Sequence, residues 1–253
     1  MFLLILSTKD DTFYHYTKKF YFYDLKKQDV MSYIVQNISE LRLCIPPRIK
    51  IIAISKTKTV SEIREAIKAG QYIFGENKVQ ELSGKYGQIP EAQWHLIGHL
   101  QTNKVKYVVP FVQMIQSVDS FRVLEEINRQ AGKINRAIDC LLQIHIAREE
   151  TKFGLSEKEA VELLENPELQ NFKHIRLRGL MGVATFTDNL DTIRGEFRGL
   201  AKFFQLIRKE YFTNDVSFCE LSMGMSDDYR IAIEEGATMV RIGSLIFGKR
   251  IYS

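Results

Sequence analysis

The fold is decided by an alternation first seen in RIKIIAISKTKTVSEIREAIKAGQYIFGE, residues 48–76. Apolar, β-branched side chains dominate its beginning, apolar residues then recur at i, i+3 and i+4 spacing, and an apolar, aromatic run follows. The pattern predicts a strand over 48–55, a helix over 60–70 and a second strand over 71–76. Strands that are apolar almost throughout are typical of a parallel sheet covered by helices.

The same alternation continues to the end of the chain, with amphipathic helical segments between the strands. The further strand candidates are WHLIG (94–98), MIQSV (114–118), DCLLQIHI (139–146), IRLRGLMG (175–182), FCELS (218–222) and MVRIG (239–243). Eight strand–helix units favour a closed (β/α)8 barrel of the TIM type over an open sheet. Because little chain follows the last strand, we expect the helical segment 32–43 to occupy the position of the eighth helix.

Two regions differ in organisation. Residues 1–30 are aromatic and lysine-rich without regular spacing, and Met31 precedes the first segment that has a structural pattern. Residues 1–30 are therefore predicted to be an extension of uncertain structure, with Met31 as the natural start or the extension loosely attached. An extra strand or helix packed on the barrel is the alternative. Residues 31–253 are predicted to form one domain.

Composition narrows the class of protein. The chain has 35 basic and 31 acidic residues, a formal net charge of +4, and the two signs are interspersed. Nucleic-acid binding is therefore not expected. The apolar start MFLLILS is too short to span a membrane and lacks the features of a signal peptide. Three cysteines without paired spacing indicate reduced thiols in the cytoplasm and no metal site.

The first strand ends in an unusual residue for a buried strand. Lys56 follows the apolar run directly, and Lys58 lies two positions further on. Burial and a neighbouring cation both favour a neutral amine, the form that reacts with an aldehyde to form a Schiff base. Extension of the side chain to solvent is the alternative, and this residue alone does not decide between them.

The last two strands end in turns suited to an anion. Gly224 allows close backbone approach, Ser226 is a candidate N-cap of the following helix, and Gly243 and Ser244 offer backbone amides. Barrels commonly hold a phosphate group after strands seven and eight, although ordinary turn chemistry also explains these residues. Strands one and eight are neighbours in a closed barrel. A small ring with an aldehyde at one end and a phosphate at the other, as in pyridoxal 5′-phosphate (PLP), would bridge the two features.

With these residues in place, the chain resembles the YggS/PROSC family of pyridoxal phosphate homeostasis proteins. The resemblance covers roughly residues 48–250 and is carried by the stretches IIAISKTKTVSEIREAIKAGQYIFGENKVQEL, WHLIGHLQTNKVKYVV, IQSVDS, QIHIAREETKFGL, GLMGVATF and ELSMGMSDDYRIAIEEGATMVRIGSLIFGKR. It implies a PLP fold-type III barrel like the N-terminal domain of alanine racemase. His99, where many members carry proline, is a departure.

The resemblance also assigns residues. It implies the Schiff base on Lys56, phosphate binding by the Ser226 turn and by Gly243 and Ser244, and Arg241 facing the pyridine nitrogen. An arginine would leave that nitrogen unprotonated and disfavour amino-acid chemistry. The remaining cofactor-binding positions are Asn77, Met223 and Gly224. Lys58 and Lys152 are candidates for a secondary PLP site, with plain surface lysines as the alternative.

Two classes of function follow. The favoured one is a PLP-binding homeostasis protein that buffers or delivers cofactor without turnover, with PLP-dependent apo-enzymes as partners and a monomeric state. The alternative is a fold-type III racemase or decarboxylase. Such enzymes use a second β domain, which is not expected here because the chain ends directly after the barrel. A cofactor-free Schiff-base aldolase is a third interpretation, but it would not need the phosphate cradle.

Overall fold

The computed structural model describes residues 32–149 and 153–248. The chain divides into two units at Tyr33 and Ile34, and all strands of the barrel lie in the second unit, which begins at Ile34. The extension expected over residues 1–30 lies outside the described residues. No helix of the described residues is long and apolar enough to cross a membrane.

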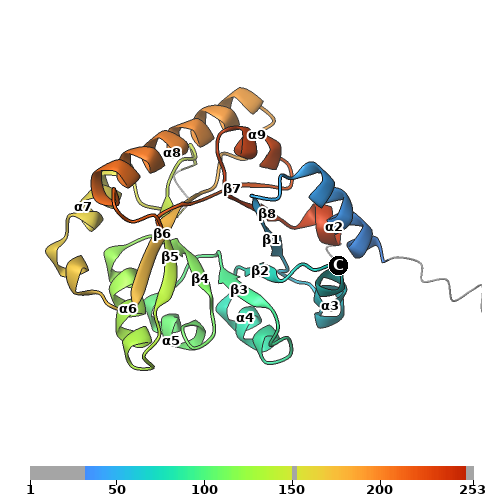
Figure 1. Ribbon diagram of the computed structural model, residues 1–253, viewed down its shortest axis with the longest axis horizontal. Helices are drawn as coiled ribbons and strands as arrows, with labels where there is room; N and C mark the ends of the chain where they lie inside the picture. The colour runs from blue at the N-terminus through green and yellow to red at the C-terminus, as the bar shows by residue number, and fades with distance from the viewer. Residues whose placement is uncertain (1–31, 150–152, 249–253) are drawn as a thin grey trace, which may run out of the picture. The chain divides into compact units, whose positions relative to one another are not determined.

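A closed parallel barrel forms the centre of the second unit, with its strands paired in sequence order and β8 joined to β1. Figure 1 shows the strands surrounded by the helices. The strands are β1 (Lys50–Ile54), β2 (Ile73–Glu76), β3 (Gln93–Leu96), β4 (Met114–Val118), β5 (Ile138–Ile144), β6 (Ile175–Gly182), β7 (Glu220–Met225) and β8 (Met239–Ile242). All eight predicted strands and the TIM-type barrel are thus confirmed.

Helices follow the strands around the outside of the barrel (Figure 1). They are α2 (Tyr33–Cys44), α3 (Val60–Lys68), α4 (Val79–Tyr86), η1 (Thr102–Lys104), α5 (Val105–Val108), α6 (Phe121–Gly132), α7 (Glu157–Leu164), η2 (Pro167–Asn171), α8 (Leu190–Tyr211), α9 (Tyr229–Glu234) and α10 (Ser244–Phe247). The local sequence determines where several of these helices begin. Thr59 and Ser156 form capping boxes with Glu62 and Glu159, which satisfy amide groups that a helix leaves without internal partners.

Two layers of side chains make the core. The larger cluster lies between strands and helices and includes Phe74, Trp94, Phe197 and Phe218, all at most 1% exposed. The smaller cluster fills the barrel interior with Ile52, Met114, Leu141, Met181 and Met239. Because alternate residues of a strand face opposite sides, strands β1, β4, β5, β6 and β8 supply both layers.

The helix before the first strand takes the place of a long eighth helix, as predicted. Helix α2 buries Ile34, Ile38 and Leu41 in the outer core. The Asn37 side-chain amide donates a hydrogen bond to the Ile246 carbonyl at 3.0 Å, which places α2 beside α10. Helix α10 has only four residues, so α2 covers this side of the barrel.

Candidate functional site

A cavity of about 630 Å³ opens at the carboxyl ends of β1 and β8, a size typical of small-molecule sites. Six of the residues predicted from the sequence line it: Lys56, Lys58, Ser226, Arg241, Gly243 and Ser244. Phe186, Met225 and Asp227 also line it and were not predicted as site residues. Phe186 is 90% exposed. The cavity thus brings together three cationic side chains and two turns that offer polar groups.

Barrel closure explains why these residues meet. Strands β1 and β8 are paired in parallel, with Ile52 opposite Arg241. A Cβ on Gly243 would lie 3.4 Å from the Cβ of Ile54, so the two strand ends are in contact. The turn that carries Lys56 therefore lies beside the turn that follows β8, although the two are nearly two hundred residues apart in sequence.

Lys56 occupies the turn that follows β1. Its side chain is half-buried and lines the cavity. The next residue, Thr57, has a φ of 67°, a left-handed conformation that is uncommon for residues other than glycine.

Arg241 projects from β8 and is only 4% exposed. Its Nη1 donates to Ser222 Oγ at 2.8 Å, and its Nη2 donates to the Gly182 carbonyl at 2.8 Å. Burial lowers the pKa of Arg241 to about 10, and the nearby Asp228 opposes that effect. The guanidinium remains a cation at neutral pH and is held at the bottom of the cavity in one orientation.

A chain of buried polar groups continues from Arg241 across the barrel. Ser222 Oγ donates to Gln116 Oε1 at 2.7 Å, and Gln116 Nε2 lies 2.8 Å from His95 Nδ1. Burial, with a contribution from Lys50, lowers the pKa of His95 to about 3, so the imidazole is neutral and its Nδ1 accepts from Gln116. Each group in the chain thus donates in the same direction, away from Arg241.

The sequence did not lead us to predict this row of hydrogen-bonded polar side chains. The signal was present, because a glutamine inside MIQSV and a serine at the end of FCELS interrupt buried apolar strands. Buried polar side chains need partners. Which partners they find, however, depends on residues that come from other strands.

The Ser226 turn differs from its prediction in one respect. Helix α9 begins at Tyr229 with Asp228 at the N-cap, so Ser226 is not the cap residue. Instead, Ser226 Oγ accepts a hydrogen bond from the Gly243 amide at 3.2 Å. The reason is that the intervening turn is closed by the Asp228 carboxylate, which accepts from the Met225 amide; burial raises the pKa of Asp228. The bond from Gly243 ties the turns after β7 and β8 together.

Three predicted positions do not line the cavity. Met223 is fully buried in the outer core, so its side chain faces the helices. Gly224 has a φ of +88°, and a Cβ there would lie 2.5 Å from the Cβ of Ala232, so glycine is required for α9 to pack. Asn77 is half-buried after β2. The predicted position Lys152 lies outside the described residues.

Lys58 lines the cavity, but its ammonium is already engaged. Nζ donates to the Phe247 carbonyl at 2.9 Å and to Glu62 Oε1 at 3.2 Å. These bonds link the start of α3 to the end of α10. An exchange of cofactor onto Lys58 would have to break them.

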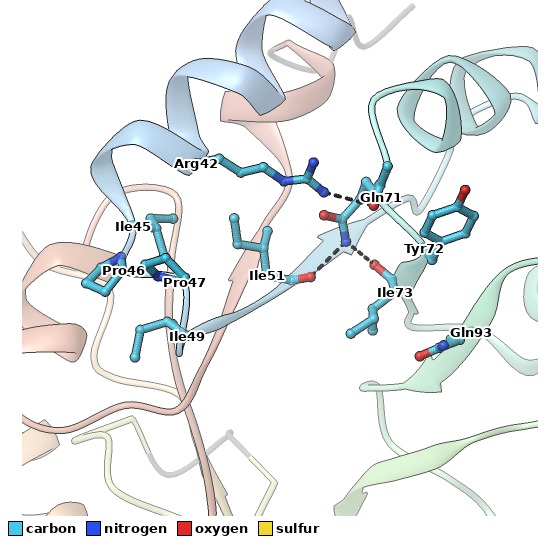
Figure 2. A pocket seen from close by; sticks show the side chains of 11 residues that line it. Arg42, Ile45, Pro46, Pro47, Ile49, Ile51, Gln71, Tyr72, Ile73 and Gln93 are labelled. Carbon is cyan, nitrogen blue, oxygen red and sulfur yellow. Dashed lines mark hydrogen bonds between the residues drawn. The ribbon is translucent and has the colours of Figure 1, made fainter.

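A second hollow, of about 500 Å³, lies at the opposite end of the barrel near the starts of β1, β2 and β3. Figure 2 shows the side chains of Arg42 and Gln71 bonded to backbone carbonyls. Arg42 donates to the carbonyls of Ala69 and Gly70, and Gln71 donates to those of Ile51 and Ile73. Arg42 and Gln71 thus serve structure, and we take the cavity at the carboxyl ends of the strands as the candidate site.

Comparison with known proteins agrees with this geometry. The family model for the N-terminal domain of alanine racemase matches residues 31–250, which defines the class of barrel. An alanine racemase from Clostridium difficile shares this fold at 14% identity, with a TM-score of 0.67 over 89% of this chain and 58% of the racemase.

Within that class, the chain belongs to the pyridoxal phosphate homeostasis protein family, the YggS/PROSC family that it resembles in sequence. A member from Aquifex aeolicus is 41% identical over 206 residues, which cover 80% of this chain and 88% of the relative. The structure of PipY from Synechococcus elongatus PCC7942, solved with PLP bound, is 34% identical and has a TM-score of 0.78. It covers 85% of this chain and 100% of PipY.

Proposed function

We propose that this chain binds PLP in the cavity at the barrel mouth and serves intracellular PLP homeostasis, by buffering or delivering the cofactor. One observation carries the proposal: Lys56, Arg241 and the tied turns of Ser226 and Gly243 line a single cavity. An amine, a guanidinium and a polar cradle are the groups that an aldehyde, a pyridine nitrogen and a phosphate require. The names of the relatives and the PLP-bound PipY structure support it.

The residues of the cavity divide into roles. Lys56 would hold the cofactor as a Schiff base. The Ser226 hydroxyl and the Ser244 backbone amide would bind the phosphate, and Gly243 would support them through the bond from its amide to Ser226 Oγ. The first amides of a helix lack internal partners, so the start of α10 supplies donors to an anion. Arg241 would face the ring nitrogen. Outside the lining, Gly224 allows α9 to pack and Met223 packs in the outer core, while Asn77 stays a candidate cofactor-binding residue. Lys58 and Lys152 stay candidates for a secondary site.

Arg241 favours a carrier over an enzyme. Amino-acid chemistry on PLP uses the ring as an electron sink, and a protonated ring nitrogen strengthens it. Because Arg241 keeps its own proton and donates, the nitrogen that it faces stays unprotonated. The chain's own residues thus bind and orient the cofactor but disfavour carbanion formation. A racemase or decarboxylase activity is the competing function.

Further aspects of the proposal concern context. We place the PLP-binding domain at residues 31–253, and we propose that it acts as a monomer in the cytoplasm and passes PLP to apo-enzymes. The unpaired state of Cys44, Cys140 and Cys219 supports a reducing compartment. Burial raises the pKa of the Cys140 thiol, which makes that cysteine unreactive.

The test is spectroscopic and chemical. Purified protein incubated with PLP should develop a visible absorption band that borohydride bleaches, and peptide mass spectrometry should then find a pyridoxyl group on Lys56. Lys56→Ala should lose both signals, whereas the matched variant Lys58→Ala should keep the adduct on Lys56. An unlabelled Lys56 in the wild-type protein would refute the proposal. Exchange of an amino acid Cα proton for solvent deuterium would instead favour the enzyme.

A further inference from the structure

A buried ion pair lies next to the turn that carries Lys56, outside the barrel and beneath α4. Lys85 of α4 and Glu76 of β2 are 7% and 0% exposed, and Lys85 Nζ lies 2.6 Å from Glu76 Oε1. Removing two charges from water is unfavourable, and well-packed apolar residues often stabilise a protein as well or better. The position of this pair therefore needs an explanation beyond stability.

The ammonium of Lys85 uses all three of its protons. Besides Glu76, it donates to the Ser55 carbonyl at 2.7 Å and to Glu81 Oε1 at 2.7 Å. Ser55 Oγ in turn donates to Glu76 Oε1 at 2.7 Å. The residue that precedes Lys56 is thus held through both its side chain and its carbonyl.

The residue that follows Lys56 is held by the same group of side chains. The Thr57 amide donates to Glu81 Oε1 at 2.5 Å, and Thr57 has the left-handed φ of 67°. An uncommon backbone conformation persists only where its surroundings enforce it. Lys85 and Glu81 therefore restrain the backbone on both sides of Lys56.

We propose that Glu76, Glu81 and Lys85 form a positioning cluster that aims Lys56 into the cavity. The inference rests on the proposed function only for its consequence in PLP binding; the restraint itself is a property of the cofactor-free protein. None of the three side chains lines the cavity, so the cluster acts through the backbone of the turn.

The main variant is Glu76→Gln/Lys85→Met, which removes both buried charges and nearly keeps their volumes. The matched control is Glu65→Gln/Lys68→Met, the same chemical change in an exposed pair of α3 whose charged atoms lie 2.7 Å apart. Hydrogen exchange of residues 55–58 is measured without cofactor, and the dissociation constant for PLP is measured by absorbance titration. Melting temperature reports on stability.

We expect the main variant to exchange the Thr57 amide at least about tenfold faster and to bind PLP about tenfold more weakly, equal to about 1.4 kcal/mol. The control should change neither quantity. Glu81→Gln, which keeps an acceptor for the Thr57 amide, should stay close to wild type, whereas Glu81→Leu should behave like the main variant. Glu81 is part-exposed, so these two variants test the idea even if the buried pair cannot be replaced in a folded protein.

Two failures can be told apart. If exchange and PLP affinity in the Glu76→Gln/Lys85→Met and Glu81→Leu variants match those of the control, the positioning cluster is wrong, whatever the melting temperature does. If wild-type protein shows no adduct on Lys56 but the exchange difference is present, the cluster positions the turn and the proposed function is wrong.

Discussion

Replacement of Ser222 by alanine tests the buried polar chain that supports Arg241. Ser222 Oγ accepts from Arg241 Nη1 at 2.8 Å and donates to Gln116 Oε1 at 2.7 Å. Ser222 and Gln116 are 0% exposed and Arg241 is 4% exposed, so water does not replace the hydroxyl easily. The substitution removes one oxygen atom and leaves a buried donor and a buried acceptor with one partner fewer each.

The expected loss of stability comes from those two bonds. A hydrogen bond to a charged group contributes about 1.5–3 kcal/mol, and a buried polar atom left unpaired costs about 1–3 kcal/mol. Since neighbouring groups relax and Arg241 keeps its bond to the Gly182 carbonyl, we expect a total near the lower sum, about 2.5 kcal/mol. For a domain of this size, about 2–4 °C per kcal/mol then gives a fall in melting temperature of roughly 5–10 °C.

Urea unfolding of cofactor-free protein, followed by circular dichroism, measures the difference. Ser83→Ala is a matched control, because the Ser83 hydroxyl is buried yet has no hydrogen-bond partner among the described residues. Its loss should change the free energy of unfolding by no more than about 0.5 kcal/mol. If Ser222→Ala lowers the free energy of unfolding by less than about 1 kcal/mol, or by no more than the control does, the row of buried polar groups does not hold Arg241.

Two further predictions concern the turn after β7 and the pH dependence of stability. Gly224→Ala should lower the free energy of unfolding by about 3 kcal/mol, because of the positive φ and the overlap with Ala232. The control Gly236→Ala should lower it by only about 1 kcal/mol, because nothing lies within 4 Å of its added Cβ. Equal losses for the two variants in urea unfolding would contradict a requirement for glycine at position 224. The pKa of His95 falls from 6.5 to about 3 on folding, so the unfolded chain takes up the proton first as the pH falls. The stabilisation that a neutral His95 provides is complete above pH 6.5. It decreases by about 1.4 kcal/mol per pH unit as the pH falls from 6.5 towards 3. His95→Gln should remove this pH-dependent contribution. Between neutral pH and about pH 4.5, the free energy of unfolding of the wild type should therefore fall by about 2–3 kcal/mol more than that of the variant. Parallel curves of unfolding free energy against pH for the two proteins would contradict a neutral buried His95.

The order of elements could be predicted from the sequence because local patterns encode it. Each strand is a short apolar run, and each long helix repeats apolar residues on one face, so alternation alone placed eight strands within a few residues of their bounds. Eight repeated units leave few ways to bury all strands other than closure. Closure in turn brings the first and last strands together, so the sequence alone predicts that Lys56 lies near Gly243.

The contacts that complete the site depend on tertiary structure. Gln116 and Ser222 are 106 residues apart, and only strand register and inward orientation bring their side chains together. Met223 faces the outer core because it alternates with the inward-facing Ser222. The pairing of β7 with β8, however, shifts register between Ser222 and Met225. Such an irregularity leaves no periodic trace in one strand.

The sequence by itself thus determined the barrel, its closure and the position of a lysine beside two polar turns, because these follow from hydrophobic periodicity and from the order of strands. Only the tertiary structure decided which buried polar groups pair, that Ser226 binds Gly243 and does not cap α9, and that Lys85 restrains the turn of Lys56. The physical reason is that hydrogen bonds and ion pairs are short and directional, so they are fixed by the meeting of residues from different strands and helices.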